Sequence, residues 1–191
     1  MQTNILICGV GGQGIILTSK LIAAAAMEQG IPVMSAETIG MAQKGGSVFS
    51  FLRLGDDLHC PMFPPHSADI LIGFEPAEAV RMLPYLKDGG TVVLNTHPIM
   101  PVTAALAGSD YTGEEMTAYL RSRIEKLVCT DGDAACKALG SPKVLNMVML
   151  GLAVRQNIIP FTTDDIERIM RATVKPQFAE LNSLALRYEA E

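Results

Sequence analysis

The chain has 191 residues, a length typical of one ordinary domain, and 49% of them are apolar, which is enough for a sizeable core. Charged residues make up only 18%, and the net charge of −5 argues against nucleic-acid binding, which usually needs a basic face. No apolar run is long enough to span a membrane and no signal peptide is recognisable, so we expect a cytoplasmic protein.

The first element is a predicted buried strand over residues 4–9, followed at once by a glycine-rich turn. Gly9, Gly11 and Gly14 spell G-x-G-x-x-G, and a helical pattern runs over 13–29 until Gly30 stops it. A second strand is predicted over 31–37. The order strand, glycine turn, helix, strand predicts a βαβ unit.

A glycine-bearing loop over 38–47 leads to a second α/β repeat. Prolines at 61, 64 and 65 exclude a central strand there and favour an edge or extended loop. In chain order we predict a strand over 48–54, a strand over 70–74, a helix over 76–85, a turn at 88–90 and a strand over 91–95.

The remaining chain is predicted to be mainly helical. We expect irregular chain over 98–114, then a helix and a short strand over 115–128, and a short helix over 133–139. A helix over 144–156 is apolar nearly all round and should be buried. Thr162 or Thr163 caps the next helix, and a last helix runs over 176–190. The fold class is therefore α/β: a single three-layer Rossmann-like domain over 1–191, with a mainly parallel sheet, helices on both faces and a helical C-terminal part.

Metal and cluster sites are not expected in this chain. Its four cysteines form no C-x-x-C pair, and Cys8 lies in an apolar run where it packs as a small hydrophobe. The three histidines, His59, His66 and His97, are scattered without the spacing of metal ligands.

The glycine turn is the first candidate binding element. Glycines allow close approach of a ligand, and the N–H groups that begin a helix attract phosphate. Glu37, at the end of the predicted second strand, lies near the place of the acidic ribose ligand in nicotinamide-binding proteins. These features predict a phosphate-bearing ligand, with NAD the simplest. The alternative is a tight strand–helix turn that binds nothing.

The stretch ETIGMAQKGGSV, residues 37–48, is the second candidate. It places Gln43, Lys44 and Ser47 beside the pair Gly45-Gly46, which suits a loop that meets a ligand or another chain. An ordinary exposed loop is the alternative.

Together, GVGGQG and the downstream E-x-x-G-M-A-Q-K-G-G-S-V resemble the gamma-type domain of 2-oxoacid:ferredoxin oxidoreductases, and within it the small (beta) subunits of the indolepyruvate enzymes. ADILIGFEPAEAVR, GGTVVLN and KPQFAELNSLAL match as well, so the resemblance covers most of the chain. The family usually has arginine where this chain has Lys44, which keeps the charge but loses bidentate oxyanion binding.

The resemblance implies one subunit of a heteromeric enzyme that converts a 2-oxoacid and coenzyme A to acyl-CoA, CO₂ and reduced ferredoxin. The chain lacks a thiamine diphosphate motif and a cysteine cluster. Thiamine diphosphate, magnesium and iron–sulfur clusters are therefore expected on a larger thiamine-binding, ferredoxin-type partner, through which ferredoxin is reached. We expect no catalytic residue here and no nucleic-acid or membrane partner.

By the same resemblance, the residues assigned to coenzyme A or to the partner are Gly11, Gly12, Gln13, Gly14, Glu37, Gln43, Lys44, Gly45 and Gly46. The substrate is expected to be an arylpyruvate. The alternatives are a gamma subunit for pyruvate, 2-ketoisovalerate or 2-oxoglutarate, a stand-alone NAD(P)-binding oxidoreductase, and a purely structural partner.

Overall fold

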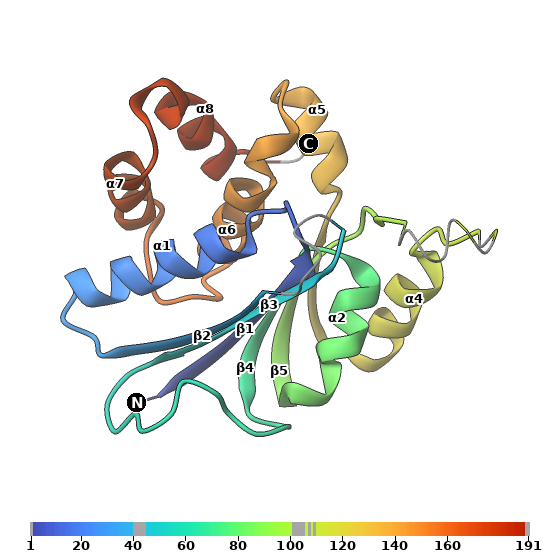
Figure 1. Cartoon of the computed structure of the whole chain (residues 1–191), viewed down its shortest axis with the longest axis horizontal. Helices are drawn as coiled ribbons and strands as arrows, with labels where there is room; N and C mark the ends of the chain where they lie inside the picture. Colours follow the sequence, from blue (N-terminus) through green and yellow to red (C-terminus); the bar gives the residue numbers. More distant parts are fainter. Residues whose placement is uncertain (1, 40–44, 101–105, 107, 109, 190–191) are drawn as a thin grey trace.

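The computed structural model describes residues 2–39, 45–100, 106, 108 and 110–189. They form three layers, with a six-stranded sheet between two sets of helices (Figure 1). The strand order is β2-β3-β1-β4-β5-β6. The strands are β1 (Thr3–Val10), β2 (Val33–Ile39), β3 (Ser47–Leu54), β4 (Ala68–Gly73), β5 (Leu86–Asn95) and β6 (Lys126–Thr130).

The pairings β1–β4, β4–β5 and β5–β6 are parallel, whereas β3 is antiparallel to both β1 and β2. The central strands read as continuous apolar runs because helices cover both of their faces. The predicted α/β class, with a mainly parallel sheet and helices on both faces, is confirmed.

The helices follow the caps and prolines in the sequence. Pro76 occupies the first turn of its helix, and Thr162 forms a capping box with Asp165. The helical elements are α1 (Ile15–Glu28), α2 (Pro76–Met82), η1 (Leu83–Tyr85), α4 (Glu114–Arg123), α5 (Gly132–Ala138), η2 (Pro142–Val144), α6 (Leu145–Arg155), α7 (Thr163–Thr173) and α8 (Pro176–Leu186). None of the described helices is long and apolar enough to cross a bilayer.

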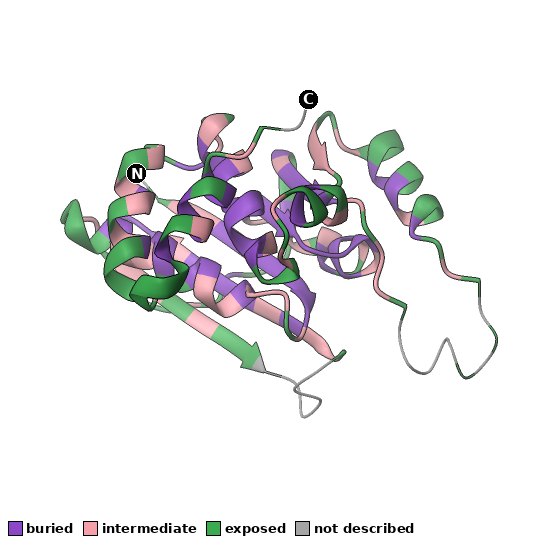
Figure 2. Cartoon of the chain, turned by 90° about the horizontal axis from the view of Figure 1, so that it is seen from above, coloured by how far each residue is buried: buried purple, intermediate pink, exposed green. Residues whose placement is uncertain are grey.

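Two apolar cores lie on opposite faces of the sheet, and Figure 2 shows the buried residues running through the middle of the molecule. One core joins the sheet to α1, α5 and α6, with α7 and α8 packed outside them. The other joins the sheet to α2 and α4. Under β3, Phe63 from the chain between β3 and β4 packs edge-to-face on Phe51, with ring centroids 4.8 Å apart.

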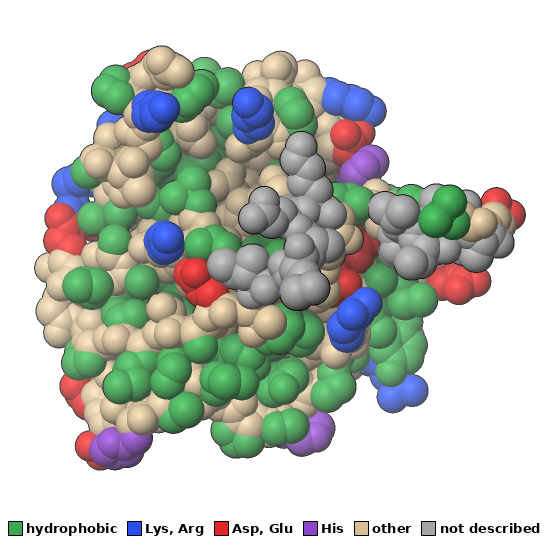
Figure 3. Space-filling model, in the orientation of Figure 1, with side chains coloured by type: hydrophobic (Ala, Val, Ile, Leu, Met, Phe, Trp, Pro, Cys, Tyr) green, Lys and Arg blue, Asp and Glu red, His purple; other side chains and the backbone are tan. Residues whose placement is uncertain are grey.

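The face beneath β2 and β3 carries loop rather than helix, and Figure 3 shows apolar side chains gathered over the lower half of the view. Phe49 and Ala36 are only partly buried there, and Met62 is 51% exposed. Exposed apolar surface of this kind is typical of interaction sites.

Two details differ from the sequence expectation. The predicted βαβ unit is not a pair of neighbouring strands, because β3 lies between β1 and β2 and pairs with both. Asp88-Gly89-Gly90 is not a turn but lies within β5. The register there jumps from Ala68↔Leu86 to Ile70↔Thr91, so the extra residues form a bulge with φ of 70° at Gly89.

Glu167 links α7 to α8, and its ionisation should make the stability of the helical C-terminal part depend on pH. Hydrogen bonds from Ser183 and Arg187 lower the pKa of Glu167 from 4.5 to about 2. The contribution of ionised Glu167 to the free energy of unfolding is therefore complete above pH 4.5 and is lost as the pH falls towards 2.

We expect Glu167→Gln to lower the free energy of unfolding by about 1–2 kcal/mol at pH 7, with the deficit shrinking below pH 4. Denaturant unfolding at several pH values measures this. Glu180→Gln is the matched control, because Glu180 is 81% exposed and pairs only with Arg171 among the described residues. A deficit equal in both variants would contradict the assignment.

Candidate functional site

The candidate site lies at the carboxyl edge of the parallel strands. From β1 the chain crosses to α1 on one face of the sheet, and from β4 it crosses to α2 on the other. Such a divergence between neighbouring parallel strands leaves a crevice where ligands bind in open α/β sheets. The glycine turn after β1 and the start of α2 after β4 line this crevice.

The glycine turn leaves the first turn of α1 free to meet an anion. Gly12 and Gly14 have φ of 104° and 87°, a region in which glycine is favoured. Gly14 is the N-cap and supplies no side-chain acceptor, and no acidic residue lies in the first turn. The leading N–H groups of this 14-residue helix therefore lack a side-chain cap within the described chain, and they carry the positive end of its dipole.

Gln13 fastens this turn to the sheet. Its Oε1 accepts a hydrogen bond from the backbone N–H of Val10 at 2.7 Å, and its Nε2 donates to the carbonyl of Phe74 at 2.8 Å. A Cβ on Gly9 would lie 2.6 Å from that Oε1, so Gly9 makes the room for the amide. Both ends of the Gln13 side chain are thus engaged by backbone. The Gln13 side chain therefore faces the sheet, and its assignment to coenzyme A or the partner stays a prediction.

The start of β3 completes the turn. The backbone N–H of Gly11 donates to the carbonyl of Gly46 at 2.8 Å, and Val10 pairs with Ser47 at the end of the β1–β3 ladder. The structure therefore brings Gly11, Gly12, Gln13 and Gly14 together with Gly45 and Gly46. Gln43 and Lys44 lie outside the described residues.

Glu37 is not part of this group. It is exposed on β2 and pairs with Ser50, which in turn pairs with Ile7, three residues before the end of β1. Because β3 stands between β2 and β1, two strand spacings, roughly 10 Å, separate Glu37 from β1. An acidic ribose ligand would be expected on a strand adjacent to β1, so this placement speaks against nicotinamide binding.

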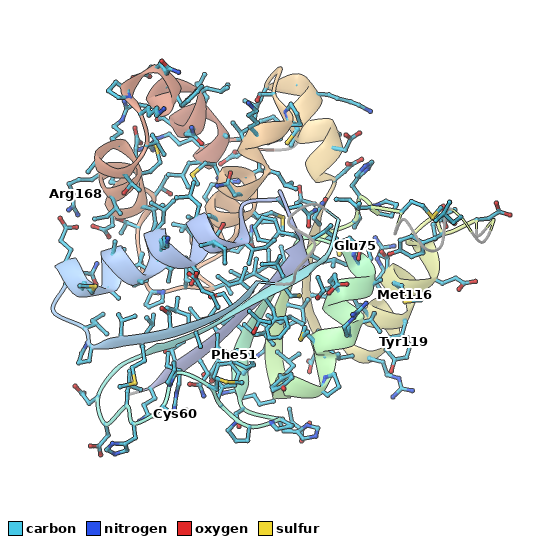
Figure 4. The ribbon with its side chains drawn as sticks, viewed as in Figure 1. Phe51, Cys60, Glu75, Met116, Tyr119 and Arg168 are labelled. Carbon is cyan, nitrogen blue, oxygen red and sulfur yellow. The ribbon has the colours of Figure 1, made fainter. Side chains whose placement is uncertain are left out.

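Two buried carboxylates at the start of α2 were not assigned from the sequence. Glu75 and Glu78 are 2% and 6% exposed. Glu78 accepts a hydrogen bond from Ser47 Oγ at 2.5 Å and pairs with Arg81 at 3.1 Å. The signal was present in FEPAE, where carboxylates three residues apart begin a helix directly after a buried strand. Figure 4 shows Glu75 at the start of α2, next to the carboxyl edge of the sheet.

Tyr111 contacts the start of α2 through Glu75 and Ala77. Its hydroxyl donates to Glu75 Oε1 at 2.5 Å and accepts from the N–H of Ala77 at 3.2 Å. Burial and then the Glu75 carboxylate raise the pKa of Tyr111, so the phenol remains a donor across the neutral range. Glu75 also caps α2 by accepting from the N–H of Glu78 at 3.0 Å.

Asn95, at the end of β5, continues the polar edge towards β6. Its Nδ2 donates to the Phe74 carbonyl at 2.9 Å, and its Oδ1 accepts from the N–H of Gly132 at 2.9 Å and of His97 at 3.2 Å. Asn95 is 1% exposed. A single carbonyl, that of Phe74, thus accepts from both Gln13 and Asn95.

A cleft of about 460 Å³ opens beside the glycine turn. It combines backbone, apolar side chains and one cation, and is lined by Gly11, Gly12, Gly14, Ile15, Ile16, Leu17, Lys20 and Val48. Behind Gly14 lies Asn146, 3% exposed, whose buried Oδ1 has no hydrogen-bond partner among the described residues. A larger cleft of about 570 Å³ lies at the opposite edge of the sheet, between α2 and α4, and contains none of the expected site residues.

Metal and cluster ligands are not assembled among the described residues. No group of three or more histidine, cysteine or acidic side chains there is placed to hold a metal ion. Cys8 and Cys136 are buried, Cys129 is half-buried and Cys60 is exposed. Burial, with the charges of Glu78 and Glu75, raises the pKa of Cys8, which packs in the core as an inert apolar side chain.

The comparisons with known proteins all indicate the same family. Residues 4–189 match the family model described as pyruvate ferredoxin/flavodoxin oxidoreductase. Over 188 residues the chain is 37% identical to the indolepyruvate oxidoreductase subunit IorB of Archaeoglobus fulgidus, a match covering 98% of this chain and 93% of the relative. It is 24% identical over 180 residues to the pyruvate/ketoisovalerate oxidoreductases common subunit gamma of Thermococcus kodakarensis, covering 93% and 89%.

A solved structure shares the fold. The 2-oxoglutarate:ferredoxin oxidoreductase from Magnetococcus marinus, solved with 2-oxoglutarate, coenzyme A and succinyl-CoA bound, aligns with a TM-score of 0.70 at 19% identity. The match covers 97% of this chain and 30% of that one, so the fold seen here corresponds to one part of a longer polypeptide.

The two left-handed glycines of the turn should respond differently to a methyl group. A Cβ on Gly12 meets nothing within 4 Å, whereas one on Gly14 would lie 2.8 Å from the Cβ of Asn146. We expect Gly12→Ala to cost only the positive-φ strain, about 1–2 kcal/mol, and Gly14→Ala to cost at least 1 kcal/mol more. Denaturant unfolding compares them, and equal costs would show that Asn146 does not press on the turn.

The Tyr111–Glu75 hydrogen bond should stabilise the crevice. Within the described part of the chain, Tyr111→Phe leaves Glu75 Oε1 with a single long contact, at 3.4 Å, to the N–H of Ile99. We expect a loss of about 1.5–3 kcal/mol, the range for hydrogen bonds to charged groups. Tyr119→Phe is the control, since Tyr119 is 41% exposed and its hydroxyl forms no hydrogen bond with the described residues. Equal unfolding midpoints for the two variants would contradict the role.

Proposed function

The chain belongs to the pyruvate ferredoxin/flavodoxin oxidoreductase family, and we propose that it is the small, non-redox subunit of a ferredoxin-dependent arylpyruvate oxidoreductase. The complete enzyme would convert an arylpyruvate such as indolepyruvate, coenzyme A and two oxidised ferredoxins to an acyl-CoA, CO₂, two reduced ferredoxins and a proton. The observation that carries the choice of substrate class is the 37% identity with the indolepyruvate subunit, against 24% with the pyruvate/ketoisovalerate subunit.

The electron-transfer and thiamine chemistry belongs to a larger partner in this proposal. Thiamine diphosphate with its metal, and iron–sulfur clusters, do not fit this chain, because its described residues hold no metal-ligand group and its cysteines do not converge. The partner would therefore carry the redox centres. Exposed apolar side chains such as Met62 and Leu184, at 51% and 61% exposure, suit a chain that works in a heteromer.

In this proposal, the role of this chain is to guide the approach of coenzyme A. The uncapped start of α1 offers N–H groups and a helix dipole to phosphate oxygens, and Lys20 lies on the same cleft. The apolar wall of Ile16, Leu17 and Val48 gives the cleft a dry side for the organic part of a ligand. Gly12 leaves open space where a side chain would otherwise stand.

The assembly is tested by expressing this chain with and without a large thiamine-binding, ferredoxin-type subunit of such an enzyme. We expect indolepyruvate-dependent and coenzyme A-dependent reduction of ferredoxin only when both subunits are present. Phenylpyruvate, pyruvate, 2-ketoisovalerate and 2-oxoglutarate serve as competing substrates. Turnover by this chain alone, or a higher kcat/KM for pyruvate than for indolepyruvate, would overturn the corresponding part of the proposal.

The coenzyme A site is tested at Gly12 with a charged and a neutral variant of equal size. Aspartate and asparagine both tolerate positive φ, so Gly12→Asp and Gly12→Asn differ mainly in charge. We expect Gly12→Asp to raise KM for coenzyme A about tenfold at low salt, and Gly12→Asn less than threefold, because only the carboxylate repels phosphate. Equal KM values, or micromolar binding of NADH to the isolated chain in calorimetry, would refute this site.

A further inference from the structure

We propose that Gln13 and Asn95 are positioning residues, which together hold the glycine turn at a fixed distance from the β5–β6 edge through the carbonyl of Phe74. This inference rests on the proposed function, because the property it affects is the approach of coenzyme A to that turn. Neither side chain is required to touch the ligand: both ends of each amide are already bonded within the protein.

The two amides act where the backbone ladder stops. The last register pair between β1 and β4 is Cys8↔Gly73, and the last between β4 and β5 is Gly73↔Leu94. One residue further on, side chains replace the missing ladder bonds. Gln13 bridges the end of β1 to Phe74, and Asn95 bridges the end of β5 to the same carbonyl.

The Phe74 peptide is a firm anchor for both. Its N–H donates to the carbonyl of Cys8 at 2.8 Å, and its carbonyl accepts at 2.8 Å from Gln13 and at 2.9 Å from Asn95. A carbonyl oxygen has two lone pairs, so the two donors use its full capacity. A shift of either amide therefore changes the geometry that the other amide meets.

Glycines leave room for both amides. A Cβ on Gly9 would approach Gln13 Oε1 to 2.6 Å, and a Cβ on Gly132 would approach Asn95 Oδ1 to 2.8 Å. A Cβ on either glycine would press on one of the two amides, although at Gly132 it would meet Leu145 Cδ1 first. This packing holds each amide in one place, so the order of the glycine turn depends on side chains from β5 as well as on its own sequence.

Neutral, similar-sized substitutions test the inference without adding charge near a phosphate site. Gln13→Met and Asn95→Leu each remove one donor to Phe74, and the double variant leaves that carbonyl without either. In the complete enzyme we expect each single change to raise KM for coenzyme A about tenfold, with kcat and KM for indolepyruvate within twofold of the parent. The double variant should exceed the product of the single effects, because it orphans the shared carbonyl.

A direct readout on the isolated chain keeps the test independent of the ligand and of assembly. Amide hydrogen exchange of residues 11–17 should accelerate at least tenfold in Gln13→Met, and also in Asn95→Leu, although Asn95 is remote in sequence from that turn. The matched control is Asn182→Leu, which removes the same kind of amide-to-carbonyl bond, from Asn182 Nδ2 to Phe178 at 2.7 Å, in α8. It should leave exchange in 11–17 and KM for coenzyme A unchanged.

The outcomes separate this inference from the proposed function. If the Gly12 variants affect KM for coenzyme A but Gln13→Met and Asn95→Leu do not, the positioning role is wrong and the site stands. If exchange in 11–17 is equally fast in Asn182→Leu, the effect is general destabilisation and the inference fails. If exchange accelerates only in the Gln13 and Asn95 variants while no variant affects KM for coenzyme A, the ligand assignment fails instead.

Discussion

The carbonyl of Phe74 accepts hydrogen bonds from two side-chain amides at the point where the β1, β4 and β5 ladders end. A parallel sheet has no intrinsic means of fixing its strand ends beyond the last ladder bond, and loops that start there inherit that freedom. In this chain, the hydrogen bonds of Gln13 and Asn95 remove that conformational freedom. The glycine turn, the start of α2 and the start of α5 are consequently held in one frame, and the cleft beside α1 takes its shape from that frame.

A second constraint acts through buried negative charge. Glu75 and Glu78 remain nearly inaccessible because their oxygens receive a tyrosine hydroxyl, a serine hydroxyl, backbone N–H groups and one arginine. The two hydroxyl donors come from other parts of the chain: Ser47 begins β3 and Tyr111 precedes α4. The start of α2 therefore gathers two neighbouring segments at the carboxyl edge. An apolar replacement would leave those donors without acceptors, so the carboxylates specify an arrangement as much as they stabilise it.

Much of the fold was predictable because periodicity and caps are local signals. The glycine turn, the buried run of β1, the Pro76 helix start and the Thr162 cap each identified an element. The place of β3 between β1 and β2 was not predictable, because pairing partners depend on contacts far apart in sequence. Asp88-Gly89-Gly90 has the residues of a turn, although it forms a bulge. At the site, the assignment of the turn glycines to coenzyme A or the partner stays a prediction, although the structure does bring them together. The hydrogen bonds of Gln13 to Val10 and Phe74, and the roles of Glu75, Asn95 and Tyr111, depend on neighbours that the sequence does not reveal.

The position of β3 has a consequence for how the molecule forms. β2 and β3 are close in sequence, so pairing them closes a short loop, whereas joining β3 to β1 brings together segments on either side of α1. The carbonyl of Gly46 belongs to the connection between β2 and β3, yet it holds the N–H of Gly11. The hydrogen bond from Gly11 to Gly46 can therefore form only when β3 lies against β1, so the geometry of the glycine turn depends on a contact between segments far apart in the sequence.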